Sequence, residues 1–63
     1  MTSTFKIEFE CDNAAFSEYP QAECVRILND ITDKLTYNGQ TDGIIFDVNG
    51  NRIGQWCLDM VED

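Results

Sequence analysis

The chain has 63 residues and a formal net charge of −8, from twelve acidic and four basic side chains. Nucleic acids and anionic membranes attract basic surfaces, so this charge predicts no nucleic-acid partner and no membrane association. A chain this short forms one small domain, residues 1–63, which buries only about 60% of its unfolded surface and gains from added support such as a partner chain.

Residues 4–11 predict the first strand because apolar and charged side chains alternate along them. The apolar set is Phe5, Ile7, Phe9 and Cys11, and the charged set is Lys6, Glu8 and Glu10. The connector that follows carries Phe16 and Tyr19, each of which either lies over an edge of the core or stands exposed. We carry forward the second alternative, in which both are exposed aromatic side chains available to a partner.

Residues 20–37 predict a single helix. Pro20 suits the first helical position, and Gly39 suits the left-handed position that follows the last turn. Apolar side chains recur at spacings of three and four and form one stripe, made of Cys24, Ile27, Leu28, Ile31 and Leu35. Glu23 and Arg26 fall on the polar side, which we expect to face solvent.

Residues 43–48 and 52–60 predict two strands joined at Asn49-Gly50, a pair that suits a tight hairpin turn with positive φ at both central positions. Trp56 is expected in the core. The sequence leaves open which face of the hairpin is buried, and we favour Ile44, Phe46 and Val48 on the same, helix-facing side. The opposite side of the sheet is the predicted interaction face, with Glu8, Glu10, Ile45, Asp47, Ile53, Gln55 and Asp59.

The element order β-α-β-β predicts the α+β class, with a three-stranded, mainly antiparallel sheet and one helix packed on one face. Two strand orders fit this pattern. With the last strand in the middle, all neighbours are antiparallel; with the second strand in the middle, the first two strands form a right-handed parallel crossover. We favour the first order.

The hairpin string also has the spacing of calcium ligands, at Asp47, Asn49 and Asn51. A calcium loop needs glycine at its sixth position and glutamate at its twelfth, where this chain has Arg52 and Leu58. The string is therefore interpreted as a turn in which Asp47 and Asn49 bond local backbone groups.

No catalytic or metal-binding constellation is predicted, and no cofactor. The three cysteines form no CxxC pair and the chain has no histidine, so a zinc site would lack ligands. Cys11 and Cys24 are expected as buried thiols in a reducing cytoplasm. Glu8 and Glu10 share a strand face, but acid–base catalysis needs a cleft that so small a domain hardly provides, so we predict that the chain is not an enzyme.

Three sequence blocks stand out together: Asp12-Asn13-Ala14-Ala15-Phe16; Pro20, Glu23 and Arg26-Ile27-Leu28; and Asp47 to Gly54 with Trp56. These blocks resemble a family of very small, uncharacterised proteins encoded in tailed-phage and prophage genomes. The resemblance covers most of the chain and implies a phage context and the cytoplasm of a bacterial host. It carries over no catalytic or binding residue.

The sequence therefore predicts a small acidic phage accessory protein that acts by protein–protein binding. Its partner would be a host protein, including one of the defence machinery, or a second copy in a homodimer. The alternative is a structural, homo-oligomeric phage protein without a host target.

Overall fold

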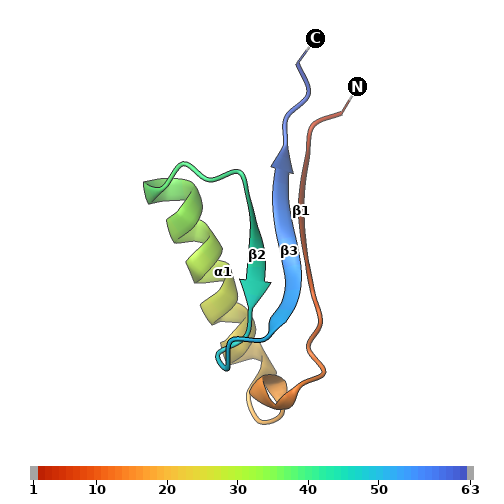
Figure 1. Cartoon of the computed structure of the whole chain (residues 1–63), viewed down its shortest axis with the longest axis vertical. Helices are drawn as coiled ribbons and strands as arrows, with labels where there is room; N and C mark the ends of the chain where they lie inside the picture. Colours follow the sequence, from red (N-terminus) through yellow and green to blue (C-terminus); the bar gives the residue numbers. More distant parts are fainter. Residues whose placement is uncertain (1, 63) are drawn as a thin grey trace.

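The computed structural model describes residues 2–62, and it has one helix packed on a three-stranded sheet (Figure 1). The elements are β1 (Thr4–Phe9), the 3₁₀ turn η1 (Ala14–Phe16), α1 (Pro20–Tyr37), β2 (Asp42–Phe46) and β3 (Arg52–Asp59). The predicted α+β class is confirmed. The predicted domain, residues 1–63, also includes Met1 and Asp63, which lie outside the described residues.

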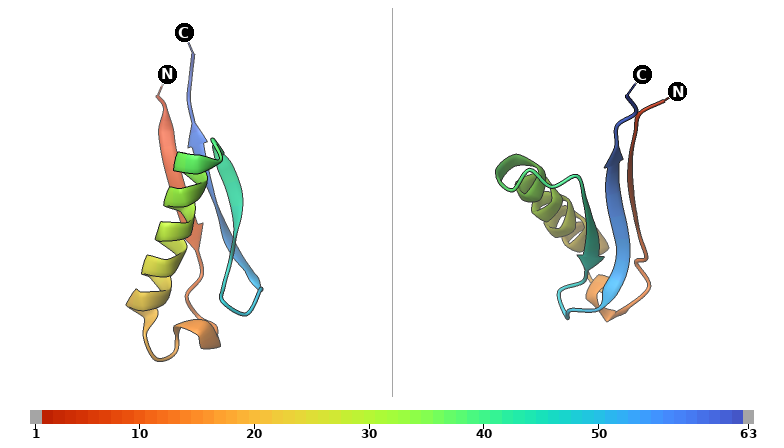
Figure 2. Two further views of the ribbon diagram at one scale, coloured as in Figure 1. Left: turned by 90° about the vertical axis from the view of Figure 1, so that its left-hand side faces the viewer. Right: turned by 45° about the horizontal axis from the view of Figure 1, so that its top comes forward.

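The sheet has β3 in the middle, antiparallel to both of its neighbours, in the order β1-β3-β2. This is the favoured strand order. α1 covers one face of the sheet and leaves the other open (Figure 2). The bounds of α1 are those predicted, whereas the strands predicted at 4–11, 43–48 and 52–60 end earlier, at Phe9, Phe46 and Asp59.

Local signals explain where α1 begins and ends. Pro20 occupies the first turn, and Tyr19, at the N-cap position before it, makes no capping hydrogen bond with its side chain. At the other end Gly39 adopts a φ of 62°, and the N–H of Gln40 donates to the carbonyl of Lys34 at 3.2 Å. The left-handed glycine thus ties back the last turn, as its position in the sequence predicts.

Five apolar side chains form the buried core: Phe16, Ile27, Ile31, Ile45 and Trp56. The core position predicted for Trp56 is confirmed, but the exposure predicted for Phe16 is wrong. Asn13 caps η1 by accepting the N–H of Ala15 at 3.0 Å, and the turn directs the Phe16 ring inward. There it stacks with the ring of Phe9 at a centroid distance of 6.2 Å. Tyr19 is exposed, as predicted.

The inward and outward sides of β2 are the reverse of those predicted. Ile44 and Phe46 are 37% and 50% exposed, and Val48 beyond them is exposed too, whereas Ile45 and Asp47 are each only 4% exposed. Ile45 lies opposite Gly54, on the side of the sheet where Trp56 is buried. Both alternating sets of β2 are apolar, so alternation alone could not decide which one faces α1.

The hairpin turn also differs from the predicted two-residue form. The N–H of Gly50 donates to the carbonyl of Asp47 at 3.0 Å, and the N–H of Asp47 donates to the carbonyl of Asn51 at 2.9 Å. Gly50 has a φ of 85°, while no non-glycine residue in the described chain has a positive φ. The connection is therefore a three-residue loop, Val48 to Gly50, with a single left-handed residue at its end.

Gly54 supports a close approach of β1 and β3, which gives a first prediction. A Cβ at this position would overlap the carbonyl oxygen of Glu8 and lie 2.5 Å from the Cα of Phe9. Because backbone atoms cannot move aside as a side chain can, we expect Gly54→Ala to lower the free energy of unfolding by about 3 kcal/mol in urea denaturation.

Gly50→Ala is the matched control, since no atom lies within 4 Å of its Cβ position and only the positive φ opposes the change. It should cost about 1–2 kcal/mol. Equal costs for the two variants would contradict the close approach at Gly54.

Candidate functional site

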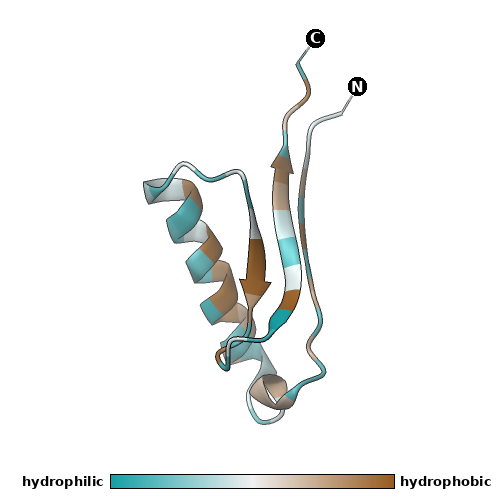
Figure 3. Cartoon of the chain, viewed as in Figure 1, coloured by the Kyte–Doolittle hydropathy of each residue, from teal (hydrophilic) through white to brown (hydrophobic). Residues whose placement is uncertain are grey.

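The face of the sheet opposite α1 is the candidate site, and we call it the open face. All of its side chains belong to exposed residues: Thr4, Lys6 and Glu8 of β1, Asp42, Ile44 and Phe46 of β2, and Gln55, Cys57 and Asp59 of β3. Ile44 lies opposite Gln55, which in turn lies opposite Glu8. The open face is thus apolar on β2 and charged on β1, and the hydrophobic end of β2 stands out in Figure 3.

The structure brings only part of the predicted interaction face together. Glu8, Gln55 and Asp59 lie on the open face as predicted, and Glu10 is exposed just past the end of β1.

Three residues of the predicted interaction face lie elsewhere, and their prediction is wrong. Ile45 and Asp47 are buried, and Ile53 is half-buried against the core. A register shift in the β2–β3 pairing, between Ile45 and Phe46, leaves Ile53 without a partner in β2 and interrupts the alternation of β3.

The pairing of Trp56 with Gly43 is the signal that sequence reasoning missed. The indole covers Gly43, because a Cβ there would lie 2.6 Å from its Nε1 atom. A large aromatic residue opposite a glycine marks the inward side of both strands. Counting by twos from Gly43 would have placed Ile45 inside and exposed Ile44 and Phe46.

Asp47 anchors the hairpin through a turn network that it forms with Asn13, Asn49 and Asn51. Its Oδ1 accepts the backbone N–H groups of Asn49 and Asn51, both at 2.9 Å. Its Oδ2 accepts the side-chain amides of Asn51 at 3.0 Å and Asn13 at 2.6 Å. One buried carboxylate thereby joins η1, the loop and the start of β3.

Glu23 and Arg26 fasten α1 to the same loop. Glu23, expected to face solvent, is buried; it accepts the Nε–H of Arg26 and the backbone N–H of Val48 at 3.0 Å. The Arg26 Nη2 donates to the carbonyl of Phe46 at 3.1 Å. Glu23 and Arg26 therefore bond two backbone groups at the end of β2, the N–H of Val48 and the carbonyl of Phe46, that the sheet does not use.

The two buried carboxylates have lowered pKa values. The hydrogen bond from Arg26 is the main cause for Glu23, where burial works against it and the N–H of Val48 adds to it. Burial opposes the ionisation of Asp47, but the hydrogen bonds from Asn51, Asn49 and Asn13 outweigh it and lower the pKa. Both groups are therefore charged at neutral pH and have their oxygens occupied, which suits a structural role rather than proton transfer.

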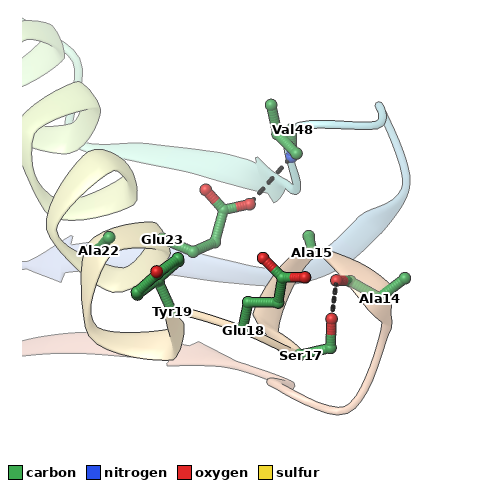
Figure 4. A pocket seen from close by; sticks show the side chains of 8 residues that line it. All are labelled: Ala14, Ala15, Ser17, Glu18, Tyr19, Ala22, Glu23 and Val48. Carbon is green, nitrogen blue, oxygen red and sulfur yellow. Dashed lines mark hydrogen bonds between the residues drawn. The ribbon is translucent and has the colours of Figure 1, made fainter.

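A hollow of about 430 Å³ lies beside this region, between η1, the first turn of α1 and the loop (Figure 4). Its lining residues are Ala14, Ala15, Ser17, Glu18, Tyr19, Ala22, Glu23 and Val48. The hydroxyl of Ser17 donates to the carbonyl of Ala14 at 2.9 Å, and the carboxylate of Glu23 accepts hydrogen bonds from Arg26 and Val48. Two of the polar groups that line the hollow are thus engaged within the fold.

The cysteines are all free thiols. Cys24 is half-buried against the core, but Cys11 is exposed, so its predicted burial is wrong. Local desolvation and then the neighbouring Cys24 thiol raise the pKa of Cys11, which keeps it protonated and weakly nucleophilic. Cys57 lies on the open face.

Within residues 2–62, no three acidic, cysteine or histidine side chains gather as a metal site would require. Asp47, the first residue of the calcium-like string, directs both oxygens at N–H donors instead. In the same part of the chain, no helix has the length and apolar character needed to cross a membrane.

No protein-family model, curated protein or solved structure matches the chain. The resemblance to small phage-encoded proteins therefore stays a prediction. The sequence blocks that carry it contain the residues that fasten the hairpin, including Asn13, Glu23, Arg26 and Asp47. These residues of the blocks thus have a role in the fold and identify no binding surface.

The turn network gives a second prediction. In Asp47→Asn, one accepting oxygen becomes an amide that faces the donors of Asn13 or Asn51. Leaving a donor unmatched in this part-buried network should lower the midpoint of thermal unfolding by roughly 10 °C. Asp33→Asn, which removes the same charge from an exposed helical position, should change the midpoint little. A similar midpoint for both variants would contradict the network.

The lowered pKa values give a third prediction, on acid stability. A carboxyl group whose pKa is lowered in the folded state stabilises the fold fully when the pH is above its ordinary pKa, which is 4.5 for Glu23 and 3.8 for Asp47. This stability is lost as the pH falls through the folded-state pKa. We expect the free energy of unfolding to decline below about pH 4.5, and less steeply in Asp47→Asn than in Asp33→Asn. Parallel curves for these variants in urea titrations would show that Asp47 does not contribute.

Proposed function

We propose that this chain is a non-enzymatic, protein-binding module and that its open face is the surface that meets the partner. The observation that carries this proposal is the exposure of Ile44 and Phe46 at 37% and 50%, two residues apart on the same side of β2. The same face of the sheet also carries the charged side chains of Lys6, Glu8 and Asp59. Apolar side chains in a polar surround are typical of protein interfaces.

Charge suggests the character of the partner. Glu8, Asp42 and Asp59 are exposed on the open face, on a chain of net charge −8. An acidic surround favours a partner surface that is basic at its margin and apolar at its centre, and it speeds the encounter at low salt. The acidic side chains would set orientation and rate, while Phe46 and Ile44 would supply most of the binding energy.

A binding role also agrees with how the polar side chains are used. The buried carboxylates of Glu23 and Asp47 are committed to hydrogen bonds within the fold. The acidic residues of the open face are exposed to solvent, and the hollows that Glu8 and Asp42 line are open rather than enclosed as a catalytic cleft would be. We therefore favour binding over catalysis.

The phage-like sequence blocks suggest the setting. We propose that the chain is a phage accessory protein that acts in the cytoplasm of a bacterial host and binds a host protein, with defence proteins as one class of target. The resemblance supports the setting, and the open face supports the mode of action.

The test is capture of the partner from lysate of a phage-susceptible host, with the variant Ile44→Thr/Phe46→Thr as the decisive comparison. Threonine keeps strand propensity while removing the apolar contact. We expect the parent chain to retain one host protein in near-stoichiometric amount, with recovery falling as salt is raised. The double variant should lose at least tenfold of this recovery.

The matched control is Val25→Thr/Tyr37→Thr, which removes two exposed apolar side chains from α1 instead of the open face. It should capture as the parent chain does. Equal capture by the open-face variant, or loss of capture in the control alone, would contradict the assignment of the surface.

A further inference from the structure

β1 is an edge strand whose outer side is unoccupied in the described chain. Just past the end of β1, the N–H of Glu10 donates to the carbonyl of Ile53 at 2.9 Å. This hydrogen bond identifies which alternate residues of β1 direct their backbone groups toward β3. Because bonding alternates along an antiparallel strand, the backbone groups of Lys6 and Glu8 point toward β3. Those of Phe5, Ile7 and Phe9 point away from the sheet.

The other edge, β2, is partly occupied by α1. The carbonyl of Phe46 accepts from Arg26 at 3.1 Å, and the N–H of Val48 donates to Glu23 at 3.0 Å. Side chains that cover an edge in this way oppose pairing with another strand. The two edges are therefore unequal, and β1 is the one that can accept a neighbour.

The helix-facing side of β1 is also incompletely covered. Phe5 and Ile7 are 43% and 38% exposed, although their cross-strand partners Leu58 and Trp56 are more deeply buried. α1 therefore leaves apolar surface beside the outer edge of β1. A strand added at that edge would cover these side chains as well as bond to the backbone.

The sequence of β1 fits one such neighbour, which is β1 of a second copy. Around Ile7 the strand reads Phe5-Lys6-Ile7-Glu8-Phe9, with opposite charges at equal distances from the centre. An antiparallel pairing centred on Ile7 brings Ile7 opposite Ile7 and Phe5 opposite Phe9, and all of these residues direct their backbone groups outward. The same pairing places Lys6 of each copy opposite Glu8 of the other, at non-hydrogen-bonded sites, where cross-strand side chains are closest.

We propose that two copies of the chain associate through their β1 strands and form a continuous six-stranded antiparallel sheet. The two-fold axis runs perpendicular to the sheet at Ile7, so both helices lie on one side and the two open faces join on the other. Phe5, Ile7 and Phe9 of both copies fill the space between the helices. The dimer enlarges a core of five buried apolar side chains, the kind of support that so small a domain needs.

This pairing does not rest on the proposed function, because it is measured on the purified chain alone. The test is sedimentation equilibrium at physiological salt, which screens the repulsion between two chains of net charge −8. We expect the parent chain to dimerise. Lys6→Glu and Glu8→Lys should each weaken the dimer about tenfold or more, since both cross-strand pairs become repulsive.

Two combinations of these substitutions restore the opposite charges across the axis and so control for effects on folding. The double variant Lys6→Glu/Glu8→Lys recreates opposite charges across the axis and should dimerise as the parent does. An equimolar mixture of the two single variants should form a heterodimer by the same rule. Amide hydrogen exchange should show the N–H of Ile7 protected in each dimer and unprotected in each single variant.

A parent chain that stays monomeric at millimolar concentration would overturn the proposal. So would a dimer that survives both single variants, because its contact would lie elsewhere. Protection of the Ile7 N–H that appears only after a different protein is added would equally overturn it, by assigning the edge to another partner.

Discussion

The buried carboxylate of Asp47 is the constraint on which the rest of the fold depends. It accepts hydrogen bonds from Asn13, Asn49 and Asn51 and so joins the segment after β1 to the hairpin. To reach those donors, its side chain must point toward the core side of the sheet. Alternation along β2 then requires Ile45 to point inward and leaves Ile44 and Phe46 outside. One polar residue thus decides which surface the molecule presents.

This dependence explains which features the sequence could predict. The apolar stripe of α1, the glycine after it and the alternation in β1 are local patterns, and they located the helix and the first strand, which ends two residues earlier than predicted. The side of β2 that faces the helix is set by contacts outside β2, namely the pairing of Gly43 with Trp56 and the hydrogen bond from Asn13 to Asp47, 34 positions apart, and the alternation within β2 does not carry that information. Phe16 was misplaced because its burial follows from a short turn that Asn13 caps, a local signal that the prediction did not use. The candidate site was therefore only partly predictable: Glu8, Gln55 and Asp59 were placed correctly, and the apolar residues of β2 were not.

The molecule concentrates its polar links at one end and leaves its surfaces free for binding. Glu23, Arg26 and Asp47 hold α1, the loop and η1 together, so their charged groups are used within the fold. What remains accessible is the open face and the outer edge of β1. These two surfaces meet at Lys6 and Glu8, so a dimer through β1 would present the apolar residues of both β2 strands on one extended surface. Self-association and partner binding are thus compatible uses of the same sheet.

The orientation of β2, with Ile45 inward and Ile44 outward, is tested by the solvent accessibility of the two side chains. The measurement is the relaxation of the isoleucine methyl groups by a soluble paramagnetic probe in nuclear magnetic resonance. The account predicts strong relaxation of the Ile44 methyl groups and weak relaxation of those of Ile45 and Ile27, which are 4% and 2% exposed. Stronger relaxation at Ile45 than at Ile44 would contradict it, and with it the open face proposed as the binding surface.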